Sequence, residues 1–229
     1  MPDHEHVYNR QAHLYDRMIS CQPSLLPALL AVRPLEGLDM VDTGAGTGRL
    51  AAVLAPFARI LSVFDRSEAM LHLTREKVAP LLPADRFRWG VADHRSLPVA
   101  DSSADLVTAG WCVCYLASSN RADWQVSLEE TMAEFRRILR PGGTIVIFET
   151  MGTGTDGPQP PDFLTGYYRQ LEERYGFTFS LLPLDYTFSS VEEAAELTGF
   201  FFGEELARQV LAKGVPVVPE WAGMWTLTV

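Results

Sequence analysis

Residues 38–54 read LDMVDTGAGTGRLAAVL, and this stretch decides the fold class. An apolar strand, expected over Leu38–Thr43, runs into glycines at positions 44, 46 and 48. Apolar side chains then recur on one face of a helix that ends near Pro56: Leu50, Val53, Leu54 and Phe57. A strand, a glycine turn and a helix in this order are typical of the first half of a βαβ unit.

Apolar strands continue to alternate with helical segments, a rhythm typical of a mostly parallel sheet covered by helices. Four further strands are expected, over Arg59–Asp65, Phe87–Ala92, Ala104–Cys114 and Thr144–Glu149. Ser67 is a suitable N-cap for the helix after the second strand, and Asn120 for a long helix before the fifth. The sequence therefore predicts a doubly wound α/β fold.

The chain after residue 150 is less regular. Glycine and proline over Met151–Pro161 indicate a loop, and Asp162–Tyr175 is expected to form a helix beside the active edge of the sheet. We interpret residues 151–189 as a candidate substrate lid. Whether this segment moves is left open.

Residues 190–229 are expected to form two helices and a last strand. Ser190 has capping-box spacing to Glu193 and opens a helix that reaches about Thr198. A second helix ends before Gly214. The segment 221–229 is expected to be an antiparallel strand at or near the sheet edge.

The amino-acid composition and the net charge disfavour several classes of protein. The 229 residues are 47% hydrophobic and 21% charged, which is typical of one globular domain. The net charge of −10 disfavours binding to nucleic acid or anionic membranes. No stretch approaches the ~18 apolar residues of a spanning helix, and the first twenty residues lack a secretory signal. We therefore expect a cytoplasmic protein.

The number and spacing of cysteines and lysines argue against three further classes of protein: disulfide scaffolds, zinc proteins and nucleotide hydrolases. Only three cysteines occur, and Cys112 and Cys114 are spaced C-x-C, so neither a disulfide scaffold nor a zinc site is expected. Buried cysteines of this kind are more often small apolar residues than nucleophiles. Lys77 and Lys213 are the only lysines, and neither follows a glycine loop as in nucleotide hydrolases.

The glycine loop and an acid after the second strand indicate a nucleoside cofactor. Glycines allow close approach of a ligand, and Asp65 can accept hydrogen bonds from both ribose hydroxyls. Nicotinamide and adenosyl-sulfonium cofactors both use such an acid. Arg49 stands where a dinucleotide loop of the form G-x-G-x-x-G has its last glycine, so the loop reads G-x-G-x-G.

Several motifs in order resemble the class I S-adenosylmethionine-dependent methyltransferases of the small-molecule type. They are Val41–Gly48, Asp65, Ala92–His94, Ala104–Val107 and Leu139–Gly143. The resemblance spans residues 8 to 150 and implies a Rossmann-like, mostly parallel seven-stranded sheet with an antiparallel C-terminal strand. The implied parts of this single domain are N-terminal cap helices (1–36), a cofactor-binding core (37–150), the lid (151–189) and C-terminal helices with the last strand (190–229).

The resemblance also implies cofactor contacts. Gly44, Ala45 and Gly46 would approach the methionine portion of S-adenosylmethionine. Asp42 and the Gly110 carbonyl would hold its ammonium, and Asp65 its ribose. The adenine would lie against four residues: Arg66, Met70, Asp93 and His94. The product would be S-adenosylhomocysteine.

Tyr8 and Tyr15 are seven residues apart and share one face of an expected N-terminal helix. The sequence around them is similar to the cap that many small-molecule methyltransferases fold over the cofactor. An aromatic ring near a sulfonium gains cation–π attraction. Anchoring of the helix to the core is an equally good interpretation of either tyrosine alone.

Methyl transfer by in-line displacement demands alignment and exclusion of water more than acid–base catalysis. If a base is needed, His13 and His94 are the candidates. Trp111, Tyr115, Tyr167 and Tyr168 are candidate walls of the acceptor pocket. The sequence leaves open the acceptor, the acceptor atom (oxygen, nitrogen, sulfur or carbon), and whether the protein is a monomer or a homodimer.

Two alternative functions remain. The chain can be a non-catalytic sensor or partner subunit that binds S-adenosylmethionine, because nothing in the sequence proves turnover. It can also be a nicotinamide-dependent oxidoreductase. Binding of NAD in place of S-adenosylmethionine would favour the oxidoreductase.

Overall fold

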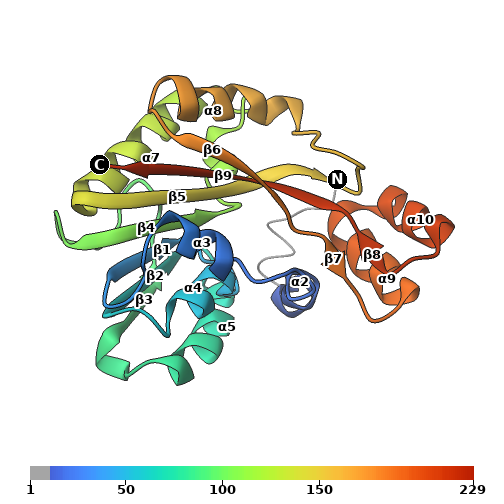
Figure 1. The fold of residues 1–229 in the computed structure, drawn as a ribbon, viewed down its shortest axis with the longest axis horizontal. Helices are drawn as coiled ribbons and strands as arrows, with labels where there is room; N and C mark the ends of the chain where they lie inside the picture. Colours follow the sequence, from blue (N-terminus) through green and yellow to red (C-terminus); the bar gives the residue numbers. More distant parts are fainter. Residues whose placement is uncertain (1–10) are drawn as a thin grey trace.

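The computed structural model describes residues 11–229, which form a seven-stranded sheet with helices on both faces (Figure 1). The strand order is β3-β2-β1-β4-β5-β9-β6. The strands of this sheet are β1 (Asp39–Thr43), β2 (Ile60–Asp65), β3 (Phe87–Val91), β4 (Ala104–Gly110), β5 (Leu139–Thr153), β6 (Thr178–Pro183) and β9 (Glu220–Thr228). The first five pair in parallel, and β9 pairs antiparallel with β5 and β6. The predicted fold class is confirmed.

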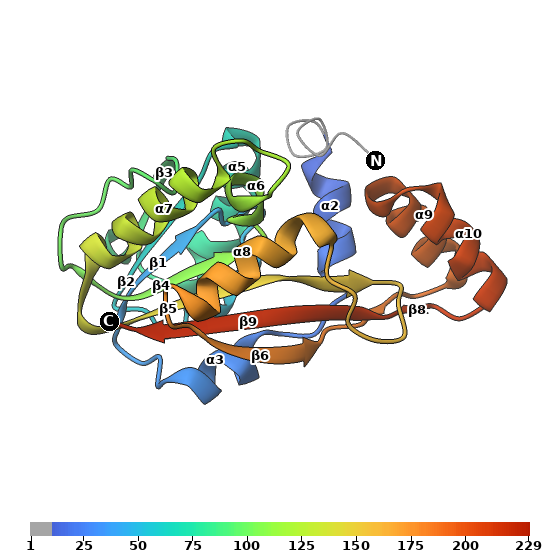
Figure 2. The same cartoon turned by 90° about the horizontal axis from the view of Figure 1, so that it is seen from above.

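Alternation along the strands builds two cores on opposite faces of the sheet. Val41 and Ile145 point to one face, whereas their neighbours Met40 and Val146 point to the other. The first face is covered by α7 (Trp124–Ile138) and α8 (Asp162–Glu173). The second is covered by α3 (Leu26–Val32), α4 (Arg49–Leu54) and α5 (Glu68–Val78). Figure 2 shows α3 on the face opposite to α7 and α8.

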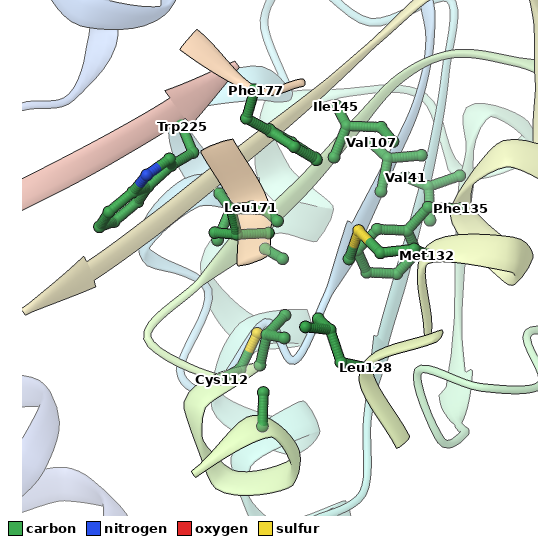
Figure 3. Packing of buried hydrophobic residues seen from close by; sticks show 14 of the residues in the cluster. Val41, Val107, Cys112, Leu128, Met132, Phe135, Ile145, Leu171, Phe177 and Trp225 are labelled. Carbon is green, nitrogen blue, oxygen red and sulfur yellow. The ribbon is translucent and has the colours of Figure 1, made fainter. Parts of the chain in front are cut away.

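The core under α7 is closely packed (Figure 3). Leu128, Met132 and Phe135 occupy one face of α7 and reach the strand residues Val41 and Val107. Burying side chains of this size stabilises the fold by roughly 1.5–3 kcal/mol each relative to exposure. The sheet is therefore a rigid platform for the loops at the carboxyl ends of its strands.

A third cluster lies beyond that end of the sheet. It joins α2 (Ala12–Ile19), β7 (Tyr186–Thr187), α9 (Val191–Phe202), α10 (Glu204–Lys213) and β8 (Val217–Val218). In both Figure 1 and Figure 2 the α9–α10 pair lies next to α2. Tyr15 of α2 packs on Phe201 of α9, with ring centroids 5.1 Å apart. Residues distant in sequence therefore close one end of the molecule together.

Helix caps follow the sequence in three places. The Ser67 side chain accepts a hydrogen bond from Met70 N, and the Ser190 side chain accepts one from Glu193 N. Gly214 ends α10 in the left-handed conformation. The α9 helix continues past the predicted end at Thr198 as far as Phe202. Its last residues, Phe201 and Phe202, also pack into the third cluster, which stabilises the extra turn.

Between the fourth strand and the long helix, two boundaries and one short helix differ from prediction. The expected fourth strand ends at Gly110, because Trp111 has a φ of +52°, and a short helix, α6 (Cys114–Ala117), follows. The long helix begins after Asp123 rather than at Asn120. The intervening turn is held by Ser119 N, which donates to the carbonyl of Phe163 at 2.9 Å.

The segment 151–189 contains the predicted loop, over residues 154–161, and the predicted helix, which is α8 (Asp162–Glu173). It also contributes strand residues: those up to Thr153 belong to β5, and β6 is the seventh strand, whose position the sequence analysis did not assign. β9 therefore lies inside the sheet, between β5 and β6 (Figure 1). Five of the six residues of β6 are exposed, although Phe177, Phe179 and Leu181 alternate with Thr178 and Ser180 in the sequence, a short period-2 pattern typical of a strand.

No helix in residues 11–229 is both long and apolar enough to cross a membrane.

Candidate functional site

The glycine loop after β1 is the centre of the site. Gly44, Gly46 and Gly48 have φ values of +64°, +55° and +86°, which L-residues with a side chain rarely adopt. A Cβ at Gly44 would lie 2.5 Å from Cys112 Cβ, so the packing of Cys112 leaves no room for a side chain at this position. A Cβ at Gly46 would meet nothing within 4 Å. Gly46 therefore presents bare backbone to open space.

Two cavities flank this loop. The smaller cavity has a volume of about 360 Å³, and the residues that line it but not the larger one include Asp65, Arg66, Ser67, Met70 and His94. The larger, of about 610 Å³, extends from the loop toward α2, α9 and the start of β9. Both volumes fall in the range of small-molecule sites. The residues lining both cavities are Tyr15, Gly44, Gly46, Gly110, Trp111 and Tyr115.

Asp42 lies at the floor of the larger cavity and is fully buried. Its Oδ1 accepts a 2.7 Å hydrogen bond from Thr108 Oγ1, whereas Oδ2 has no partner. Burial raises the pKa of Asp42 to about 7. A buried, half-satisfied carboxylate at the end of β1 favours a ligand that donates hydrogen bonds.

Arg49, the first residue of α4, extends into the same cavity. Its Nη1 donates to Gln22 Oε1 at 2.7 Å, and its guanidinium carbon lies 4.6 Å from the centre of the Trp111 ring. Its Nη2 is buried without a partner. Burial lowers the pKa of Arg49, although arginine stays charged in proteins. The free Nη2 is suited to a carboxylate of a ligand.

Two more carboxylates line the larger cavity. Glu149 of β5 is fully buried, and its Oε1 accepts from Cys114 N at 2.9 Å and from Tyr167 OH at 3.4 Å. Glu220 of β9 is 2% exposed, and its Oε1 accepts from Thr150 Oγ1 at 3.2 Å. The Oε2 atoms of both have no partner. Burial raises the pKa of Glu149 to about 7 and that of Glu220 to about 8.

His94 forms part of the wall of the smaller cavity. Its Nδ1 lies 2.7 Å from Thr43 Oγ1, and burial lowers its pKa to about 4. The ring is therefore neutral near pH 7. The neighbouring Asp93 side chain forms a two-point ion pair with Arg95, which holds the Asp93 pKa at about 2.

Comparison with known proteins agrees with this geometry. A family model described as a methyltransferase domain matches residues 41–147. The chain is 35% identical over 150 residues to malonyl-[acyl-carrier protein] O-methyltransferase of Pectobacterium atrosepticum, covering 65% of this chain and 53% of that protein. It is 33% identical over 119 residues to the ubiquinone/menaquinone biosynthesis C-methyltransferase of Paracoccus denitrificans, covering 51% and 44%.

The fold is also similar to a solved structure of phosphoethanolamine N-methyltransferase 1 from Haemonchus contortus with phosphoethanolamine and S-adenosylhomocysteine. The TM-score is 0.53 at 19% identity, over 93% of this chain and 44% of that one. These matches support the resemblance to class I S-adenosylmethionine-dependent methyltransferases. The chain spans about half the length of the curated relatives it matches.

Most of the predicted site residues come together around the two cavities. The ones that line the two cavities are Tyr15, Asp42, Gly44, Ala45, Gly46, Asp65, Arg66, Met70, His94, Gly110, Trp111 and Tyr115. They reach the site from three helices (α2, α5 and α6), from β1, from the loops after β1 and β4, and from the ends of β2 and β3. Tyr8 lies outside the described residues.

Four predicted residues are placed elsewhere. His13 is exposed on α2 and lines neither cavity. Asp93 lines neither cavity and is paired with Arg95. Tyr167 and Tyr168, expected as pocket walls, are 1% and 5% exposed and belong to the core under α8. Their helix turns these rings inward, and both touch the cavity wall only indirectly: Tyr167 OH donates to Glu149, and Tyr168 OH donates to the carbonyl of Thr150.

Arg49, Glu149 and Glu220 were not predicted as site residues. Arg49 carried a signal, since it directly follows the last glycine of the loop and so begins the helix next to any ligand. Glu149 ends the apolar run of β5, where a charged residue is unusual. No sequence signal marks Glu220, because its position depends on the antiparallel register of β9 with β5. Within residues 11–229 no group of three or more His, Cys, Asp or Glu side chains is arranged to hold a metal ion.

Proposed function

We propose that this chain binds S-adenosylmethionine and transfers its methyl group to a small molecule by in-line displacement. The observation that carries the proposal is the position of the glycine loop between two joined cavities. One cavity has the acid and apolar residues that suit a nucleoside, and the other has room for an acceptor. Gly46, which lines both, would then lie beside the reacting centre.

The unpartnered polar atoms fit the charged groups of S-adenosylmethionine. The cofactor has a carboxylate, an ammonium and a sulfonium at its methionine end. Arg49 Nη2 is free to bind the carboxylate, and Asp42 Oδ2 is free to accept from the ammonium. The aromatic residues Tyr15, Trp111 and Tyr115 surround the junction of the cavities, where cation–π attraction would favour the sulfonium.

The nucleoside end fits the smaller cavity. Asp65 uses each oxygen once, accepting from Gly46 N and Ser67 N at 2.8 Å, and a carboxylate has further lone pairs for ribose hydroxyls. Met70 and Arg66 line the space proposed for adenine. The proposed contact of Asp93 with the adenine amine would have to compete with Arg95 for the same oxygens.

A dinucleotide fits this site less well. Its pyrophosphate would lie at the start of α4, near the buried acid Asp42. Anions brought together in a site of low dielectric repel strongly. A nicotinamide dinucleotide is therefore the poorer fit to this site. The ammonium of S-adenosylmethionine would instead neutralise Asp42.

The bound cofactor would supply an electrophilic methyl group on sulfur. The chain's part is to hold cofactor and acceptor in line and to exclude water. The α2 and α9 helices close the larger cavity through Tyr15 and Phe201. Since His94 is neutral and hydrogen-bonded to Thr43, its predicted role as a base requires its other nitrogen, Nε2.

Isothermal titration calorimetry of the chain with S-adenosylmethionine, S-adenosylhomocysteine and NAD tests the cofactor. We expect the first two to bind and NAD not to bind. Transfer of a labelled methyl group into a mixture of small metabolites then tests turnover. Binding without any transfer would support a sensor in place of an enzyme.

A further inference from the structure

The larger cavity holds a polar feature that the cofactor does not require. Glu149 and Glu220 come from neighbouring antiparallel strands, and both are nine-tenths or more buried. One oxygen of each is fixed by protein donors, which leaves the two Oε2 atoms as unsatisfied acceptors in a cavity wall. Buried acceptors of this kind are costly unless a ligand satisfies them.

The two carboxylates lack a direct counter-charge. In the described part of the chain, no ion pair within 4.0 Å includes Asp42, Glu149 or Glu220. Arg49 attracts Glu220 only at longer range. A cation that enters this part of the cavity would therefore remove an electrostatic cost, whereas an anion would add to it.

The rest of the acceptor side is apolar and aromatic. Its walls include Ile19, Phe163, Leu164, Tyr186, Phe201 and Phe202. Such walls would bury a hydrocarbon or aromatic body, and their ring faces also attract a cation. The cavity thus combines apolar and aromatic walls with two buried acids, one on β5 and one on β9.

We infer that the acceptor is an amine carried on an apolar body, with its nitrogen beside the wall that carries Glu149 and Glu220 and an N–H donated to a free Oε2 of one of them. This inference rests on the proposed function and adds the class of acceptor to it. It also makes nitrogen the atom that receives the methyl group.

The reaction balances with the groups in the cavity. The amine enters as an ammonium and passes one proton to a free Oε2 of Glu149 or Glu220, which gives a carboxylic acid and a neutral amine. The nitrogen lone pair then forms the N–C bond as the C–S bond breaks, and sulfur keeps that electron pair. The products are a methylated ammonium and a neutral thioether, and the carboxylic acid later returns its proton to solvent.

Raised pKa values of these two acids suit this role. A carboxylate whose pKa is close to 7 or 8 takes a proton from an ammonium far more readily than an ordinary carboxylate. Hydrogen bonds from Cys114 N and Thr150 Oγ1 orient the two acids without using the Oε2 atoms.

Three probes with the same body and different head groups test the inference: 2-phenylethylamine, 2-phenylethanol and 3-phenylpropanoate. The unmodified chain is first titrated with S-adenosylhomocysteine, and the loaded protein is then titrated with each probe at about pH 8, where both acids can ionise. We expect the amine to bind at least about tenfold more tightly than the alcohol, and the carboxylate not to bind.

Glu149→Gln and Glu220→Gln test the residues, with Glu196→Gln as the control. Glu196 is exposed on α9, so its variant removes the same charge away from the cavity. We expect each cavity variant to weaken amine binding by about tenfold or more and to leave S-adenosylhomocysteine binding within about twofold. The control should bind both as the unmodified chain does.

The two proposals fail in different ways. If S-adenosylhomocysteine does not bind, the proposed function is overturned and this inference with it. If it binds and the carboxylate or alcohol binds as well as the amine, or no probe binds, only the amine inference is overturned. Equal amine binding by the unmodified chain and both cavity variants would also overturn it.

Discussion

The backbone N–H of Gly46 donates a 2.8 Å hydrogen bond to Oδ2 of Asp65. The acid at the end of β2 thus fixes the glycine loop after β1, in addition to any contact with a ribose. Thr74 Oγ1 holds the same glycine from the other side, donating to its carbonyl at 2.7 Å. The shape of the loop is therefore set by the two strands and α5 before a ligand arrives.

Asp65→Ala is expected to weaken binding of S-adenosylhomocysteine by about 1–3 kcal/mol, because charged hydrogen bonds to the loop and to the ribose are lost. Calorimetry gives the dissociation constant. Asp85→Asn removes an exposed acid far from the loop and is expected to bind normally. An unchanged constant for Asp65→Ala would show that the ribose is held by other residues.

Gly46→Val is expected to abolish cofactor binding without unfolding the chain, because its side chain would project into both cavities. Gly37→Val is a matched control, since Gly37 has a φ of +74°, also has no atom within 4 Å of an added Cβ, and lines neither cavity. Both variants should lose about 1–2 kcal/mol of stability through backbone strain.

Urea unfolding and calorimetry separate the two effects in these glycine variants. We expect similar unfolding midpoints, with binding lost only in Gly46→Val. If Gly37→Val also lost binding, strain rather than blocking of the cavity would explain the result.

Arg49→Met tests the proposed contact with the cofactor carboxylate. Loss of a charge-assisted pair should weaken S-adenosylmethionine binding by about 1.5–3 kcal/mol. Decarboxylated S-adenosylmethionine lacks the partner of Arg49, so its affinity should be nearly the same for the variant and the unmodified chain. Equal losses for both ligands would mean that Arg49 acts through its packing on Trp111 and Gln22.

The parts predicted well from sequence are those that a local pattern controls. Alternation and glycine spacing place β1, the loop and α4 within a residue or two, because these elements are set by their own side chains. Ser67 and Ser190 cap their helices as expected, since capping depends on residues only three positions away.

The parts missed depend on contacts between distant segments. β6 is held by pairing with β9, and its local sign in the sequence is only a short alternation of Phe177, Phe179 and Leu181 with polar residues. The cavity acids Glu149 and Glu220 are brought to one wall by antiparallel pairing across 71 residues of chain between two strands. Tyr167 and Tyr168 were expected at the pocket because aromatic residues suit pockets and cores equally, and only packing of α8 decides between them.

The raised pKa of Glu149 predicts a pH-dependent stability in the ligand-free chain. Its pKa rises from 4.5 to about 7 on folding, because burial disfavours the charged form. The folded state therefore holds the proton more tightly than the unfolded state. The resulting stability is fully present below the unfolded value and is lost as pH rises through the folded value. At ~1.4 kcal/mol per pKa unit, the loss is at most about 3.5 kcal/mol.

Glu149→Gln should remove this dependence, so the measured quantity is the difference in unfolding free energy between variant and unmodified chain from about pH 5 to about pH 8. His94, whose lowered pKa of about 4 costs stability as pH falls, contributes equally to both proteins. Its contribution therefore cancels when the two unfolding free energies are subtracted. We expect the variant to gain relative stability steadily as pH rises, and Glu196→Gln to show no trend. If the unfolding free energies of Glu149→Gln and the unmodified chain changed with pH in parallel, the Glu149 carboxyl group would not have the raised pKa that burial in the cavity wall gives it.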